Sequence, residues 1–152
     1  MTMTLEILGA AQEVTGSCHL ITFNDHKVLL DCGMIQGSKE DALRNYEPFE
    51  FTPSSIDAVI LSHAHIDHSG RLPQLVRAGF NGPIYTHKAT AELCAIMLKD
   101  AAKLQLRDTE RLNKKRLRNN LTPIQPLFYE EDVVQAIKQF VPLNYNMKKT
   151  IL

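Results

Sequence analysis

A cluster of histidines directly after an apolar segment constrains the fold of this chain more than any other feature. Residues 62–70 read Ser-His-Ala-His-Ile-Asp-His-Ser-Gly and hold three of the six histidines in the 152-residue sequence. The preceding residues 56–61 are largely apolar and β-branched, as expected of a buried strand. The cluster therefore falls in the loop that leaves the carboxyl end of a strand, where open α/β sheets place their ligands.

The spacing of the side chains in this cluster indicates a divalent metal site. Imidazole and carboxylate groups are usual protein ligands of zinc and similar ions. The intervals do not fit one helical face, because neighbours on a helix surface are three and four residues apart. An extended segment ending in a turn would place the last two side chains beside the first two. We predict four metal ligands, the alternative being a polar loop with chance histidines: His63, His65, Asp67 and His68.

Short apolar segments along the rest of the chain predict a mixed α/β domain. Strands are expected at residues 4–8, 17–23, 27–31, 56–61 and 83–86. The first three should form a β-meander. The last two flank the histidine loop and a short helix at residues 71–79, which together form a βαβ-like unit.

Two further helices are expected in the second half of the chain. A long helix, either continuous or broken, should span residues 88–119, because apolar residues recur there at helical spacing. Another should begin at Glu130, with Val133, Ile137 and Phe140 on its apolar face. Residues 37–55 are expected to form a surface loop with a short helical turn. Residues 144–152 resemble the beginning of a strand.

Basic residues are concentrated at the end of the long helix. Residues 103–118 hold seven basic and two acidic residues, a local excess of five. Such a face either contacts the phosphates of a nucleic acid or is a solvated helix end. The second reading has support because no aromatic residues are interleaved for base stacking. The candidate RNA contacts are Lys114, Lys115, Arg116 and Arg118.

Bulk composition excludes several classes of protein. The formal net charge is zero, so overall charge does not indicate a polyanionic partner. Three cysteines without a Cys-x-x-Cys pair fit reduced thiols in a cytoplasmic protein. No apolar run approaches eighteen residues, and no basic-then-apolar leader precedes the first strand, so neither a membrane span nor a signal peptide is expected.

The pattern His-x-His-x-Asp-His at residues 63–68 resembles the signature motif of the metallo-β-lactamase superfamily. Asp31-Cys32-Gly33, after the third predicted strand, resembles the first motif of that superfamily. The small-residue loop at residues 9–17, the Arg71-Leu72-Pro73 segment and residues 90–100 resemble its RNA-processing branch, which carries an inserted β-CASP domain. That branch includes ribonucleases and relatives of the mRNA 3′-end cleavage factor.

The resemblance implies an αββα sandwich, of which this chain would supply only the first half, a β-meander plus helices. Later family motifs supply a further histidine, a bridging aspartate and a last histidine. No histidine follows His87, so we expect residues 1–152 to be the N-terminal part of such a domain, with the second half and the β-CASP domain absent. His19, His26 and His87 are interpreted as strand, turn and helix-start residues.

The resemblance also implies a chemistry for the complete site, RNA phosphodiester hydrolysis with two zinc ions. His63 and His65 would ligate one ion, and Asp67 and His68 the other. Asp67 would also act catalytically by orienting or deprotonating the attacking water. Asp31 would support the histidine loop through a hydrogen bond.

Two protein ligands per ion are fewer than the three of a catalytic zinc site, so we expect weak metal binding and little hydrolysis by the chain alone. Half of a sandwich should also leave one face of its sheet uncovered and apolar. A complementing C-terminal chain or self-association would complete the site and cover that face. The alternatives are a non-catalytic remnant or interaction module, or a hydrolase of small thioesters or lactams.

Overall fold

The structure, a computed structural model, describes residues 2–151 and contains a six-stranded mixed sheet with its strands in chain order. The strands are β1 Met3–Ile7, β2 His19–Phe23, β3 His26–Leu30, β4 Ala58–Ile60, β5 Ile84–His87 and β6 Phe140–Leu143. Strands β1 to β3 are antiparallel, whereas β3 to β6 are parallel. The sheet confirms the predicted α/β class, the meander and the βαβ-like unit.

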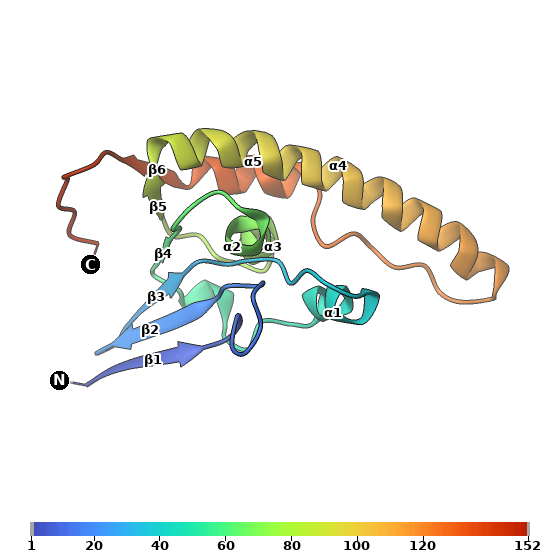
Figure 1. Ribbon diagram of the computed structural model, residues 1–152, viewed down its shortest axis with the longest axis horizontal. Coiled ribbons are helices and arrows are strands. Elements are labelled where there is room, and N and C mark those ends of the chain that lie inside the picture. Colours follow the sequence, from blue (N-terminus) through green and yellow to red (C-terminus); the bar gives the residue numbers. More distant parts are fainter. Residues whose placement is uncertain (1, 152) are drawn as a thin grey trace.

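Most of the helices cover one face of this sheet, and the first lies beyond its end (Figure 1). They are α1 Lys39–Leu43, α2 Ile66–Ser69, α3 Leu72–Arg77, α4 Lys88–Arg118 and α5 Glu130–Lys138, with 3₁₀ turns at Arg44–Tyr46 and Pro53–Ser55. Side chains at paired positions of the central strands point into the core between sheet and helices. This buried row consists of Leu20, Leu29, Val59 and Ile84.

The opposite face of the sheet presents apolar side chains to solvent at the edge strand β1. Glu6 pairs with the buried residue Leu20 and therefore points toward the helices. Because alternate residues of a strand point to opposite faces, the neighbours of Glu6 point away from the helices. Met3, Leu5 and Ile7 are 70%, 59% and 58% exposed. The expected bare face is therefore present at β1, whereas Ala58 and Tyr85, which point to the same face from β4 and β5, are buried. The apolar character of β1 is unusual for a solvent-exposed strand.

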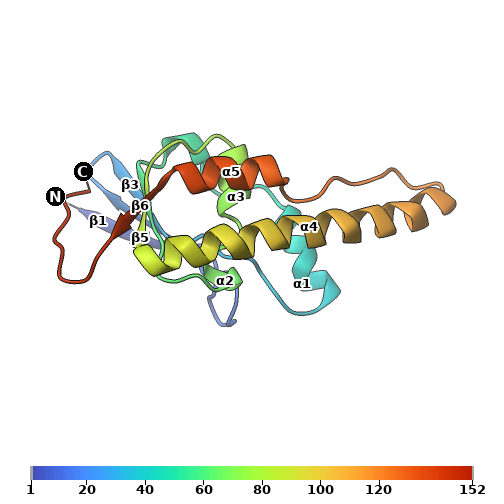
Figure 2. The same ribbon diagram turned by 90° about the horizontal axis from the view of Figure 1, so that it is seen from above.

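Helix α4 is a single continuous helix of 31 residues, not a broken one. The His87 Nδ1 atom caps its first turn by accepting from the Ala89 N–H at 3.2 Å. The first half of α4 packs beside α5, and its C-terminal half projects beyond the sheet (Figure 2). The returning chain is held there, because the Asn113 side chain bonds both backbone groups of Ile124 at 2.8 Å.

The C-terminal strand differs from its prediction. Phe140 does not extend the apolar face of α5, because α5 ends at Lys138 and Phe140 begins β6. The Ile84 N–H donates to the Gln139 carbonyl at 2.8 Å, which draws the chain into parallel pairing with β5. Pro142 is tolerated because β6 is an edge strand. The strand expected within residues 144–152 is therefore misplaced: residues 144–151 are irregular, and residue 152 lies outside the described residues.

Candidate metal centre

The histidine cluster forms the connection from β4 to the one-turn helix α2. His65 is the residue before the first turn of α2, and the Ser69 hydroxyl donates to the carbonyls of Ala64 and His65 at 2.9 and 3.0 Å. These bonds close the turn that follows the extended residues 61–64. The segment therefore has the extended-then-turn shape that its spacing predicts.

The turn brings the three histidine rings together. The ring centroids of His63 and His65 are 4.7 Å apart, and those of His63 and His68 are 4.1 Å apart. The Asp67 carboxylate lies beside them, with Oδ2 at 3.5 Å from His68 Nε2. All four predicted ligands are thus neighbours at the carboxyl end of β4, and their donor atoms are those that zinc prefers.

Asp31 lies directly under the cluster and is buried at 7% exposure. Its Oδ2 atom is 2.7 Å from His68 Nδ1, and its Oδ1 atom accepts from the Ser62 N–H at 2.7 Å. A carboxylate oxygen only accepts, so Nδ1 carries a proton, and Nε2 is the nitrogen that faces Asp67 and can bind a metal. That tautomer and that ring orientation are the ones that suit a metal ligand.

The backbone of Asp31 adopts a left-handed conformation with φ of 58°. Such a conformation is uncommon for a residue other than glycine, although aspartate tolerates it better than most residues. It ends β3 and turns the Asp31 carboxylate toward Ser62 and His68. Local strain of this kind is found at functional sites, where the surrounding structure holds it in place.

Ser62 also holds the cluster in place, a role that the sequence alone did not predict. Its hydroxyl donates to Asp31 Oδ2 at 2.8 Å and lies 3.0 Å from His63 Nδ1. It therefore links the buried carboxylate to a second histidine. The available signal was its position immediately before His63 at the end of the predicted strand.

Backbone hydrogen bonds fasten the cluster to two distant segments. The Cys32 N–H donates to the His68 carbonyl and the Ser17 N–H to the Asp67 carbonyl, both at 2.8 Å. A Cβ atom on Gly33 would overlap the Asp67 carbonyl oxygen, so only glycine permits this approach. The end of the loop at residues 9–17 therefore contacts the cluster.

The cysteines lie in the core and do not join the cluster. All three thiols are free and buried. Burial raises the pKa of the Cys32 thiol well above its usual value and that of Cys94 to about 11. Because the thiolate is the form that binds metal, these two residues remain neutral thiols near neutral pH.

The donor set suits a metal but does not close around one. Within residues 2–151, no group of three or more histidine, cysteine, aspartate or glutamate side chains is arranged to hold a single ion. The rings of His63 and His65 open instead onto a cavity of about 250 Å³ at the start of α4, lined also by Ala89, Thr90 and Leu93. Imidazole and carboxylate donors fit zinc, and the cavity leaves room for further ligands.

The remaining candidate residues lie elsewhere. His19 lies in β2 and His87 precedes the first turn of α4, as predicted, whereas His26, predicted in a turn, is the first residue of β3. Lys114, Lys115 and Arg118 are exposed near the far end of α4, and Arg116 donates from Nε to the Thr122 carbonyl at 2.7 Å. At about 1.5 Å per residue, these basic residues are roughly 36–42 Å along the helix from Thr90. The fold therefore does not bring them to the histidine cluster.

No helix within residues 2–151 combines the length and apolar character needed to cross a bilayer. That result agrees with the absence of a long apolar run in the sequence.

Comparison with known proteins identifies the family. The family profile described as "Metallo-beta-lactamase superfamily" matches residues 11–141. "Ribonuclease TTHA0252" of Thermus thermophilus is 46% identical over 143 residues, covering 94% of this chain and 28% of the relative. "Probable RNase MJ4" of Methanocaldococcus jannaschii is 37% identical, covering 97% and 30%.

"Integrator complex subunit 11" of Danio rerio is 33% identical, covering 90% of this chain and 22% of the relative. Among solved structures, the metallo-beta-lactamase fold protein YhfI of Bacillus subtilis is 34% identical with a TM-score of 0.41, covering 59% of this chain and 39% of that one. The chain spans between a fifth and a third of the length of these curated relatives. Because the family profile matches most of the chain, including the histidine cluster, the chain belongs to the metallo-β-lactamase superfamily.

Proposed function

We propose that this chain carries the first group of metal ligands of a hydrolase that cleaves RNA phosphodiester bonds. The observation that carries the proposal is the convergence of His63, His65, Asp67 and His68 above the buried Asp31 carboxylate. The relatives named as ribonucleases support RNA as the substrate class. The exposed basic residues of α4 fit an RNA partner as well.

On this proposal, the four residues of the cluster would bind two zinc ions. His63 and His65 would hold one ion, and Asp67 and His68 the other. Bound divalent ions would supply the charge needed to polarise the phosphate and stabilise the leaving oxygen. Asp31 keeps the His68 ring in its metal-binding tautomer, and Asp67 orients or deprotonates the attacking water.

We propose that further ligands come from outside the described cluster, because two protein ligands per ion do not make a catalytic zinc site. The rest of a full-length enzyme or a complementing chain that carries the later family motifs, or a second copy, would supply them. The exposed apolar row of β1 supports association with such a partner. The same row supports the second candidate function, an interaction module without catalysis. The free thiols support a reducing compartment, the cytoplasm.

The first test is the metal content of the purified chain after dialysis, measured by elemental analysis. The His63→Ala/His65→Ala variant removes two proposed ligands, and His26→Ala serves as a matched histidine control. Near two equivalents of zinc, lost only in the double variant, would support a site completed by self-association. Substoichiometric zinc in every protein would support a half-site. Equal and full zinc in all three proteins would contradict the ligand assignment.

The substrate is tested with a fluorescent ribo-oligonucleotide, a thioester and a β-lactam, each with added zinc. Once the site is complete, we expect zinc-dependent cleavage of the RNA and no hydrolysis of the thioester or the β-lactam. The double variant should not cleave the RNA. Hydrolysis of the thioester or lactam without RNA cleavage would contradict RNA as the substrate.

A further inference from the structure

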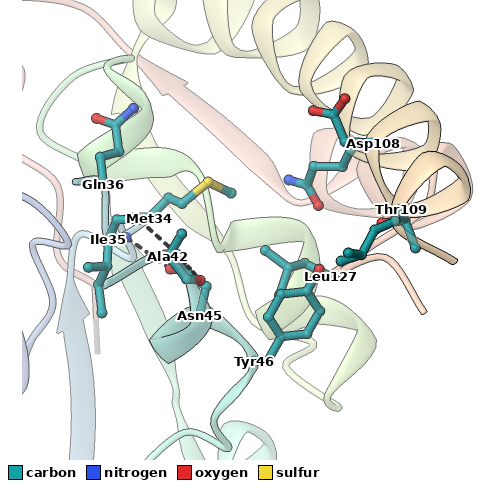
Figure 3. Close-up of a pocket in the computed structure, with 11 residues that line it drawn as sticks. Met34, Ile35, Gln36, Ala42, Asn45, Tyr46, Asp108, Thr109 and Leu127 are labelled. Atoms are coloured by element: carbon teal, nitrogen blue, oxygen red, sulfur yellow. Dashed lines mark hydrogen bonds between the residues drawn. The ribbon is translucent and has the colours of Figure 1, made fainter. Parts of the chain in front are cut away.

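A second cavity lies away from the histidine cluster, between the 3₁₀ turn after α1 and the C-terminal half of α4. Its volume is about 320 Å³, at the small end of the range of about 300–1,000 Å³ for ligand pockets. Figure 3 shows Met34, Ile35 and Asn45 on one side and Asp108 and Thr109 of α4 on the other. Leu127, from the chain that returns after α4, also lines it.

One polar group of this cavity has no partner. Gln105 belongs to the α4 wall, and its amide nitrogen and oxygen are both shielded from water without a hydrogen bond to any of residues 2–151. The amide of Asn45 on the opposite wall is fully used, since it bonds both backbone groups of Ile35 at 2.8 and 2.9 Å. A buried amide without partners is unfavourable, so a ligand that offers it one donor and one acceptor gains affinity.

The other walls suit a flat ring. Most of the lining surface comes from apolar atoms, including those of Met34, Ile35 and Leu112. Tyr46 is 44% exposed and offers an aromatic ring at the cavity. A planar heterocycle with a donor and an acceptor on one edge matches this combination, and nucleobases of single-stranded RNA are bound in this way.

Basic side chains stand beside the cavity on α4. Arg111 and Lys115 lie one and two turns beyond Asp108, on the same stripe of the helix. Both are exposed, and Arg111 is only loosely paired with Asp108 at 3.8 Å. They can therefore meet the phosphates of a strand that leaves the cavity toward the end of α4.

The cavity also shares a segment with the histidine cluster. The Met34 N–H donates to the Ile66 carbonyl of α2 at 3.0 Å, two residues after Cys32 bonds to His68. A single short stretch of chain thus holds α2 on one side and lines the cavity on the other.

We infer that this cavity binds one nucleobase of single-stranded RNA, with Tyr46 stacking on the ring and Gln105 pairing with its edge. The inference rests on the proposed function and adds a subsite that holds the RNA strand at a distance from the metal centre, along α4. The shielded Gln105 amide turns toward the base as the base enters.

The test is fluorescence anisotropy of labelled ten-nucleotide oligoadenylate and oligouridylate with the 152-residue chain, in EDTA so that no hydrolysis occurs. Gln105→Met removes the amide at similar volume, and Tyr46→Ala removes the ring. Each variant is expected to weaken binding about tenfold. The matched control Gln135→Met, at an exposed position of α5, should bind like the wild type. A 4-thiouridine oligonucleotide should crosslink to the peptide containing Tyr46.

Because binding is measured without metal, the result is independent of zinc content and cleavage. Unchanged binding in both variants would overturn the inference even if RNA cleavage were observed. If the same variants instead abolished self-association while RNA binding persisted, the cavity would be a protein-docking site and the inference would be wrong. Conversely, weakened binding in both variants would support the subsite even if the chain cleaved no RNA.

Discussion

At the scale of single residues, Asp31 sets the orientation of the His68 ring. Its carboxylate is 2.7 Å from His68 Nδ1. Asp31→Asn keeps the size of the side chain but replaces an acceptor oxygen with a donor. Zinc affinity should fall about 10- to 100-fold, as for other residues that hold a metal ligand in place. Competition with a chromophoric chelator measures this change, with Asp25→Asn in the β2–β3 turn as the control. Equal affinities would show that His68 is positioned without Asp31.

Gly33 is a second residue whose role is local. A methyl group at this position would overlap the Asp67 carbonyl oxygen, which belongs to the backbone and cannot rotate away. Gly33→Ala should lower the free energy of unfolding by at least about 2 kcal/mol. Urea denaturation followed by circular dichroism checks this value. Gly79→Ala provides a contrast, because it strains the backbone at φ of 110° without a backbone overlap. A loss under 1 kcal/mol at Gly33 would mean that the contact relaxes easily.

At the scale of elements, one ion pair ties the loop at residues 9–17 to the 3₁₀ turn after α1. Arg44 donates to both carboxylate oxygens of Glu13, at 2.7 and 2.9 Å, and the hydrogen bond from Arg44 lowers the pKa of Glu13. A lowered folded-state pKa stabilises the protein above the unfolded pKa and loses that effect as the pH falls through the folded value.

Arg44→Met should therefore lower the urea midpoint at pH 7, and the decrease should disappear at an acidic pH below the folded-state pKa of Glu13, where that carboxyl is protonated in both states. The effect should also shrink in high salt, because both side chains are partly exposed. A decrease of the same size at both pH values would assign the effect to packing of the Arg44 stem.

At the scale of the whole molecule, the sheet has helices on one face and an exposed apolar row on the other. Leu5 is 59% exposed in the middle of β1. The wild-type chain should self-associate at micromolar concentrations, and Leu5→Glu should shift it toward monomer by placing a charge in the contact. Sedimentation velocity measures the distribution, with Thr4→Glu on the other side of β1 as the control. Identical monomers of wild type and variant would contradict association through β1.

Local patterns were enough to predict much of this molecule. The apolar residues before Ser62 predict β4, because a β-branched run needs burial on both faces. The two- and three-residue intervals of His63, His65 and His68 exclude a helical face and predict the turn. The long helix follows from the helical spacing of apolar residues between Leu93 and Leu104, although these two residues are exposed and the helix buries Cys94 and Leu98 instead. These features depend on neighbours within one element, so the sequence by itself determines them.

Tertiary structure decided what depends on contacts between distant segments. Ser62 joins Asp31 only because β3 and β4 are adjacent and parallel. Strand β6 forms at Phe140 because β5 offers an open edge, which overrides the helical pattern that includes this residue. The cavity at Gln105 exists because α4 continues past the sheet while α1 packs opposite it. Strand pairing and helix packing between distant segments depend on the free energy of the whole chain. No local periodicity of apolar residues encodes them.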